Sequence, residues 1–375
     1  MAGLYIHIPF CRSRCIYCGF YSTTSLALRQ RYVDAVCREM KLRSEWRAAK
    51  GERLQIETVY LGGGTPSQLT TDQLRQLFIY INKVYPLTSQ EITIEVNPDD
   101  MTAEYATTLQ QLGINRVSMG AQTFDEDRLH FLNRRHTATQ VSEAVSLLRQ
   151  AGIRNISIDL MYGFPGETLS DWDADITRAL ALDVEHISCY CLMYEEGTPL
   201  YRLLQQGKVA ETDEEQERLM YYHLIERLEA AGYEHYEISN FARPGFRSRH
   251  NSSYWDLTPY IGLGAAAHSF DGNSRRRWNV SDISLYIEGI EGGQPCFEQE
   301  LLDDDTRYND TLTVALRTRN GLDLNTLSEH NRNYCLSEAR HYISDGLLNL
   351  QNNHLSLTKP GLFVSDMIIS DLMLI

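Results

Sequence analysis

Three cysteines near the start of the chain are spaced so that they could hold a metal centre: Cys11, Cys15 and Cys18. They follow the alternating segment 5–8, which predicts a short strand. Thiolates in a C-x3-C-x2-C run can surround one soft-metal centre from a single loop. A [4Fe–4S] cluster held by three thiolates would leave one iron free for an exchangeable ligand. A zinc site completed by His7, or three unrelated buried cysteines, would also fit this spacing.

The composition limits the classes of partner and the compartment. The chain has 375 residues and a net charge of −15, which argues against a nucleic-acid partner. Its eight cysteines form no disulfide framework and indicate a reducing compartment. No apolar run reaches the roughly 18 residues that a membrane span needs, and the first strand leaves no room for a signal peptide. We therefore expect a soluble cytoplasmic protein with no transmembrane segment, for which peripheral membrane contact stays open.

The segments that follow the cysteines alternate regularly between strand and helix patterns. Further strands are expected at 56–61, 92–96, 116–120, 156–160 and 186–191. Helices are expected at 27–50, 74–84, 102–112, 139–151, 168–182 and 213–231. Six such units predict an α/β fold with a parallel sheet. A closed eight-unit barrel needs about 250 residues, so we expect an incomplete (β/α)6 barrel within residues 1–240.

Beyond this region the alternation stops. Residues 241–295 are rich in glycine, aromatic residues and arginine, and we expect a loop-rich extension that covers the mouth of the barrel. Residues 296–375 are expected to form a C-terminal, mostly helical, winged-helix-like domain. Its predicted elements are helices near 306–317, 323–331 and 334–345 and a hairpin at 347–357. The acidic balance favours packing or partner docking over DNA binding for this domain.

Polar residues gather where the predicted strands end. They are Cys11, the glycine turn 62–65, Glu95, Asn97, Gln122 and Asp159. Because the carboxyl ends of parallel strands meet at one edge of a sheet, we expect a single site there.

The order Y-x-H-I-P-F-C-x3-C-x2-C, followed by G-G-G-T-P at 62–66, resembles the radical S-adenosylmethionine (SAM) superfamily. The resemblance implies a [4Fe–4S] cluster on the three cysteines, with its open iron chelated by the amino and carboxylate groups of SAM. It also implies an electron donor, whose electron cleaves SAM to a 5′-deoxyadenosyl radical. The positions that match family contacts to SAM or the cluster are Tyr5, Tyr17, Gly63, Gly64, Thr65, Glu95, Gln122, Arg134 and Asp159.

The chemistry of these residue types agrees with such contacts. Glycines without a Cβ let the backbone approach a ligand closely. Carboxylates such as Glu95 and Asp159 suit hydroxyl groups or an amine, and Arg134 suits a carboxylate. Taken singly, each is also an ordinary polar residue at a strand end.

Nearly the whole chain resembles one branch of this superfamily, the oxygen-independent coproporphyrinogen III dehydrogenase group. The segments Met119–Phe124 and Asp159–Gly163 carry this resemblance. Those enzymes oxidatively decarboxylate two propionates of a porphyrinogen. They have a further cysteine where this chain has Phe20, and a longer segment ahead of the Tyr5 match. We therefore expect this chain to lack the dehydrogenase activity.

The run H-N-x-x-Y-W at 250–255 resembles the HemW-type haem chaperones, relatives that bind haem and pass it to acceptor haemoproteins. An imidazole suits haem iron, so His250 is a predicted axial ligand, with Tyr254 and Trp255 beside the porphyrin. His268 and the free cysteines compete as ligands, and His250 could instead be a hydrogen-bonding loop residue. Three arginines, Arg243, Arg247 and Arg249, could pair with haem propionates. They could equally be part of the solvated surface. Three hypotheses stay open: a haem chaperone with a SAM-ligated cluster, a porphyrinogen dehydrogenase and a zinc-stabilised protein.

Overall fold

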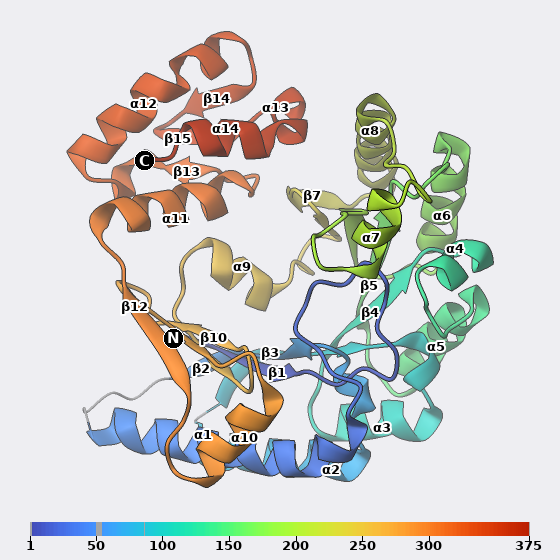
Figure 1. The fold of residues 1–375 in the computed structure, drawn as a ribbon. Coiled ribbons are helices and arrows are strands. Elements are labelled where there is room, and N and C mark those ends of the chain that lie inside the picture. Colours follow the sequence, from blue (N-terminus) through green and yellow to red (C-terminus); the bar gives the residue numbers. More distant parts are fainter. Residues whose placement is uncertain (1, 50–54, 86, 375) are drawn as a thin grey trace.

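Six strand–helix units form the first two thirds of the chain. Figure 1 shows how their helices lie around the strands. The computed structural model describes residues 2–49, 55–85 and 87–374. The strands are β1 (Ala2–Ile8), β2 (Ile56–Gly63), β3 (Leu87–Val96), β4 (Arg116–Gln122), β5 (Asn155–Tyr162) and β6 (His186–Cys191). The helices are α1 (Arg29–Ala49), α2 (Thr71–Val84), α3 (Ala103–Gln111), α4 (Glu126–Phe131), α5 (Ala138–Gln150), α6 (Leu169–Ala181), α7 (Pro199–Gln205) and α8 (Glu214–Ala230). Neighbouring strands are parallel and in chain order, so the (β/α)6 prediction is confirmed.

The two faces of this sheet differ in polarity because side chains alternate along each strand. Outward-facing side chains such as Ile6, Leu61 and Ile94 are fully buried in the main hydrophobic core with the covering helices. Facing the barrel interior, Tyr60 and Glu95 are hydrogen-bonded to each other. The helices therefore cover an apolar face, and the barrel encloses a polar one.

Short strands extend the sheet at both ends. Beyond β6 lie β8 (Asn240–Ala242), antiparallel to β6, and then β7 (Glu234–Glu237), antiparallel to β8. Beyond β1 lie β9 (Tyr260–Leu263), β10 (His268–Phe270), β11 (Arg275–Asn279) and β12 (Phe297–Leu301). The barrel stays incomplete, because in the described part of the chain β7 and β12 do not pair with each other. Helix α10 (Ile283–Glu291) packs against α1, and single 3-10 turns lie at Leu26–Leu28, Pro66–Gln68, Pro98–Asp100 and Leu324–Thr326.

Residues 241–295, which we expected to cover the barrel mouth, are divided between two places. Helix α9 (Arg249–Trp255) lies at the opposite end, where the strands begin. Its first backbone amides, at Arg249 and His250, each donate a hydrogen bond of 3.0 Å to the carboxylate of Glu91 in β3. The remaining strands of the segment join the sheet instead of covering it. They are too short, and too rich in glycine and arginine, for their periodicity to distinguish a strand from a loop.

The C-terminal module has a hydrophobic core of its own. Its elements are α11 (Asp304–Leu316), β13 (Leu322–Asp323), α12 (Glu329–Ser344), β14 (Leu348–Gln351), β15 (His354–Leu357), α13 (Lys359–Phe363) and α14 (Ser365–Asp371). The predicted hairpin is confirmed as β14 and β15. The predicted helix at 323–331 is wrong, because β13 pairs with β15 and α12 begins only after its cap, Ser328. Figure 1 shows α9 between this module and the sheet.

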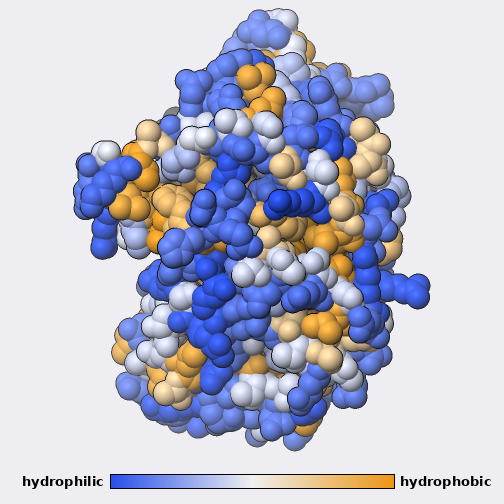
Figure 2. Space-filling model, turned by 90° about the vertical axis from the view of Figure 1, so that its right-hand side faces the viewer, coloured by the Kyte–Doolittle hydropathy of each residue, from blue (hydrophilic) through white to orange (hydrophobic). Residues whose placement is uncertain are grey.

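The surface is mixed in character. Figure 2 shows a largely hydrophilic face on which apolar areas are interrupted by polar side chains. Among the described residues, no helix combines the length and the hydropathy that a membrane crossing requires.

Candidate functional site

A cavity of about 420 Å³ opens at the carboxyl ends of the parallel strands. Every residue predicted for the cluster or SAM lines it, with the exception of Tyr5. These lining residues are Cys11, Cys15, Tyr17, Cys18, Gly63, Gly64, Thr65, Glu95, Gln122, Arg134 and Asp159. The structure thus brings residues from five strand ends to one place, while their roles in binding stay predictions.

The cysteine loop is anchored by backbone hydrogen bonds on several sides. Ile16 donates its amide to the carbonyl oxygen of Leu132 at 3.2 Å and accepts the amide of Leu200 at 2.9 Å. The Sγ atom of Cys11 lies 3.5 Å from the Oγ1 atom of Thr65. Burial raises the pKa of the Cys11 and Cys18 thiols, so without a metal both stay protonated at neutral pH.

The glycine turn after β2 presses against the end of β1. Gly63 has φ +112°, and a Cβ atom there would lie 2.4 Å from Cε1 of His7. A Cβ on Gly64 would lie 2.7 Å from the carbonyl carbon of Pro9. Only glycine fits such contacts, so the turn and the cysteine loop are held together as one unit.

Arg134 connects the cysteine loop to the strand ends. Its Nη1 atom is 3.5 Å from Sγ of Cys15, and its Nη2 atom donates to Oδ1 of Asn97 at 2.9 Å and to the carbonyl oxygen of Gly120 at 2.6 Å. Gln122, two residues after Gly120 in β4, lies at a bulge in the pairing with β5. Its φ is +67°, a conformation that costs free energy for a non-glycine residue. The guanidinium therefore sits in a fixed place on the cavity wall.

Two partly buried carboxyl groups line the cavity, Glu95 and Asp159. Burial is the main reason why the pKa of Glu95 is raised to about 7 and that of Asp159 to about 6. Glu95 accepts hydrogen bonds from Tyr60 at 2.8 Å and from the amide of Gly63 at 3.1 Å. Nearby, the Nε and Nη1 atoms of buried Arg116 have no hydrogen-bond partner among the described residues. A cationic ligand group would favour the ionised form of both carboxyl groups.

This donor set fits an iron–sulfur cluster and SAM. Three thiols from one loop border the cavity, the carboxyl groups suit an amine or hydroxyls, and Arg134 suits a carboxylate. The zinc alternative finds no support, because His7 has its Nδ1 atom 3.1 Å from the Tyr5 hydroxyl and its Nε2 atom 3.1 Å from the carbonyl oxygen of Tyr21. Within 2–49, 55–85 and 87–374, no three ligand-type side chains surround a position for a single metal ion.

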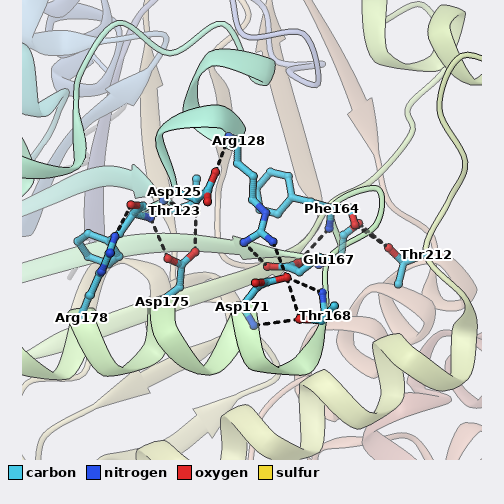
Figure 3. A network of polar contacts seen from close by, with 12 residues as sticks. Thr123, Asp125, Arg128, Phe164, Glu167, Thr168, Asp171, Asp175, Arg178 and Thr212 are labelled. Carbon is cyan, nitrogen blue, oxygen red and sulfur yellow. Dashed lines mark hydrogen bonds and ion pairs between the residues drawn. The ribbon is translucent and has the colours of Figure 1, made fainter.

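A polar network fixes the loop after β5 from outside, as Figure 3 shows. Arg128 forms ion pairs with Glu167 at 3.2 Å and with Asp171 at 3.1 Å. Glu167 accepts the amides of Gly163 at 2.7 Å and Phe164 at 3.0 Å. The loop that follows Asp159 therefore cannot move without breaking a buried ion pair.

Tyr5 and His250 lie outside the cavity lining. The ring of Tyr5 stacks on Tyr60, with centroids 6.1 Å apart. His250 is fully buried, with Nδ1 2.8 Å from Oγ1 of Thr58 and Nε2 3.0 Å from the hydroxyl of Tyr254. Both ring nitrogens of His250 therefore have hydrogen-bond partners in this structure, and haem ligation by His250 stays a prediction.

The predicted arginine cluster is also committed elsewhere. Arg243 pairs with Asp183 and Arg247 with Glu234, while Arg249 hydrogen-bonds to Gln90. Pairing with haem propionates would have to replace these contacts, and it stays a prediction.

Sequence reasoning placed Asn97 at the end of the third strand without a role, and it left out Tyr60 and His136. In the structure Asn97 holds Arg134, Tyr60 holds Glu95, and His136 lines the cavity. The Nε2 atom of His136 donates to the carbonyl oxygen of Ala121 at 3.1 Å. The strict alternation of polar and apolar residues in the parallel strands was a usable signal for Tyr60, since such strands are ordinarily apolar on both faces.

Comparisons with known proteins agree with this geometry. Residues 5–179 match the radical SAM superfamily, and residues 302–364 match the HemN C-terminal domain. The heme chaperone HemW of Bacillus subtilis is 37% identical over 332 residues, covering 88% of this chain and 86% of that protein. The chain belongs to the heme chaperone HemW family.

HemW of Escherichia coli is 33% identical to this HemW-family chain. The alignment covers 71% of this chain and 69% of the E. coli protein. A solved structure, the radical SAM enzyme coproporphyrinogen III oxidase (HemN) from E. coli, superposes with a TM-score of 0.84. It covers 99% of this chain and 90% of its own at 21% identity, which establishes a shared fold and not a shared activity.

Proposed function

We propose that this chain is a haem chaperone that binds haem and transfers it to acceptor haemoproteins. The observation that carries the proposal is its membership of the HemW family over most of its length. In the same proposal the cavity holds a [4Fe–4S] cluster on Cys11, Cys15 and Cys18, with exchangeable SAM beside it. An external electron donor would be needed to reduce the cluster.

Each residue group in the cavity has a proposed task toward SAM. Gly63, Gly64 and Thr65 would present backbone groups and a hydroxyl to its amino-acid part. Arg134 would hold a carboxylate, while Glu95 and Asp159 would accept hydrogen bonds from amine or hydroxyl groups. Gln122 and Tyr17 would line the remaining walls. A bound cluster would supply one-electron reduction of SAM.

The dehydrogenase alternative receives less support. Phe20, where coproporphyrinogen dehydrogenases have a further cysteine, is 72% exposed beside the cavity. A phenyl ring has no thiol, so Phe20 cannot do what a reactive cysteine at this position could do. The shared fold with coproporphyrinogen III oxidase does not decide between the two activities.

The test is an anaerobic haemin titration of the reconstituted chain, followed by mixing with apomyoglobin as a generic acceptor. We expect stoichiometric haem binding and transfer. The variants His268→Ala and Cys296→Ala, which alter an exposed histidine and an exposed cysteine, search for the iron ligand. Absence of haem binding by folded wild type would refute the proposal, and multiple turnovers of coproporphyrinogen III to protoporphyrinogen would establish the dehydrogenase.

A further inference from the structure

The floor of the barrel is closed by α9, whose His250 ring points into the polar interior. The ring stacks on Tyr60 with centroids 5.0 Å apart and planes 24° apart. Its Nδ1 atom lies 2.8 Å from Oγ1 of Thr58, two residues before Tyr60 in β2. A Cβ on Gly3 of β1 would lie 3.1 Å from Cε1 of the same ring. His250 is therefore enclosed between two strands and can adopt only one position.

From His250 a continuous series of contacts leads to the cavity. Tyr60, which lies on the histidine ring, donates its hydroxyl hydrogen to Oε1 of Glu95 at 2.8 Å. Oε2 of Glu95 accepts the backbone amide of Gly63 at 3.1 Å. Glu91, four residues before Glu95 in β3, receives the first amides of α9. The helix is thus tied to both strands that carry the glycine turn and Glu95.

A second buried histidine provides an internal comparison. His186 has Nδ1 2.7 Å from Oγ of Ser157 and Nε2 2.8 Å from the hydroxyl of Tyr236. Its bonding is like that of His250, yet neither of its partners has a hydrogen bond to Glu95 among the described contacts. Of these two histidines, His250 is the one whose described contacts lead to Glu95.

We infer that His250 is a positioning residue for the SAM site, acting through Tyr60 on Glu95 and the glycine turn. The inference rests on the proposed SAM site. It gives the H-N-x-x-Y-W run a task inside the barrel: His250 sets the Tyr60 ring, and Tyr254 holds the histidine from below. Haem ligation by His250 would require α9 to leave the floor and would release Tyr60.

Two near-isosteric variants test the series without opening a cavity. Tyr60→Phe removes the hydrogen bond to Glu95, and Thr58→Val removes one bond from His250. SAM binding to the reconstituted protein is measured by equilibrium dialysis. We expect SAM to bind about tenfold more weakly in Tyr60→Phe and roughly threefold more weakly in Thr58→Val, in line with the loss of one buried hydrogen bond. Iron content and haemin affinity should not change.

The matched control is Ser157→Ala, which removes the equivalent bond from His186. Its SAM affinity should equal that of wild type. A pH series adds a readout that general loosening would not produce. Burial is the main cause that raises the Glu95 pKa, and Asp159 raises it further. The hydroxyl of Tyr60, the amide of Gly63 and Arg116 lower it. Tyr60→Phe should therefore move the midpoint of SAM binding to higher pH.

The outcomes are distinguishable. Wild-type SAM affinity in Tyr60→Phe, or an equal loss in Ser157→Ala, would overturn the inference. So would a His250→Ala variant that loses haemin binding while its SAM affinity stays intact. If wild type itself binds no SAM, the proposed SAM site fails first. Should Tyr60→Phe not fold, Thr58→Val decides.

Discussion

Arg134 places its Nη1 atom 3.5 Å from the Sγ atom of Cys15. Hydrogen bonds to Asn97 and to the carbonyl oxygen of Gly120 hold the guanidinium in this position beside the cysteine loop. The same side chain faces the cavity in which a SAM carboxylate is expected. Arg134 therefore connects the cysteine loop to the part of the cavity where that carboxylate is expected.

Replacing this cation should separate SAM binding from cluster assembly. In Arg134→Met we expect the iron content to stay near that of wild type, since all three thiols remain. SAM should bind roughly 10- to 100-fold more weakly, because a charged hydrogen-bond donor is lost. Equilibrium dialysis and iron analysis measure the two effects. Arg12→Met, an exposed arginine in the same loop, is the control and should leave both values unchanged.

The three cysteines should be individually essential for the cluster. Cys11→Ala, Cys15→Ala and Cys18→Ala should each lose the iron–sulfur charge-transfer absorption, since a cube held by two thiolates leaves two irons without protein ligands. Cys296→Ala removes an exposed thiol outside the cavity lining and should keep it. A full iron and sulfide count in the triple alanine variant would contradict the assignment.

The cluster-free protein should show a pH-dependent cost of burying Asp159. Its folded pKa of about 6 lies above the ordinary value of 3.8, so the folded state binds the extra proton between these two pH values. Its contribution to stability is therefore lost as the pH rises from 4 to 6. Asp159→Asn should be as stable as wild type near pH 4 and about 1–3 kcal/mol more stable above pH 6. Denaturant unfolding across this range measures the difference, and a constant difference would contradict it.

The stability that Arg128 contributes should be larger at high pH than at low pH. Arg128→Met leaves buried Glu167, whose pKa is already about 7, without its cation. We expect a loss of about 2–4 kcal/mol at pH 8 and a smaller loss at pH 5, where Glu167 is protonated in both proteins. Arg75→Met breaks an exposed pair with Asp72 and should cost well under 1 kcal/mol. Thermal unfolding at both pH values is the measurement.

We propose that residues 296–375 form a separate domain, held to the barrel partly by Arg317. Its Nε atom is 3.3 Å from Oε1 of Glu237, a buried carboxylate in β7. Arg317→Met should increase hydrogen exchange in α11 and lower stability by about 1–2 kcal/mol. Arg307→Met, which removes an exposed pair within α11, is the control. Unchanged exchange in Arg317→Met would show that the interface does not need this pair.

The sequence alone determined the cysteine loop, the six strand–helix units and the part of the cavity lining that lies at the strand ends. These depend on spacing and periodicity among consecutive residues, and parallel strands necessarily bring their carboxyl ends together. The positions of Glu95 and Asp159 could therefore be predicted without any knowledge of long-range contacts.

Only the tertiary structure decided where His250 lies. Its helix reaches the barrel floor because β9 pairs with β1, a strand more than two hundred residues earlier in the chain. No local pattern specifies such a pairing, since it depends on which sheet edge remains free after the first six units fold together. The contact of His250 with Tyr60, and of Tyr60 with Glu95, follows from that pairing and from which face each strand turns inward.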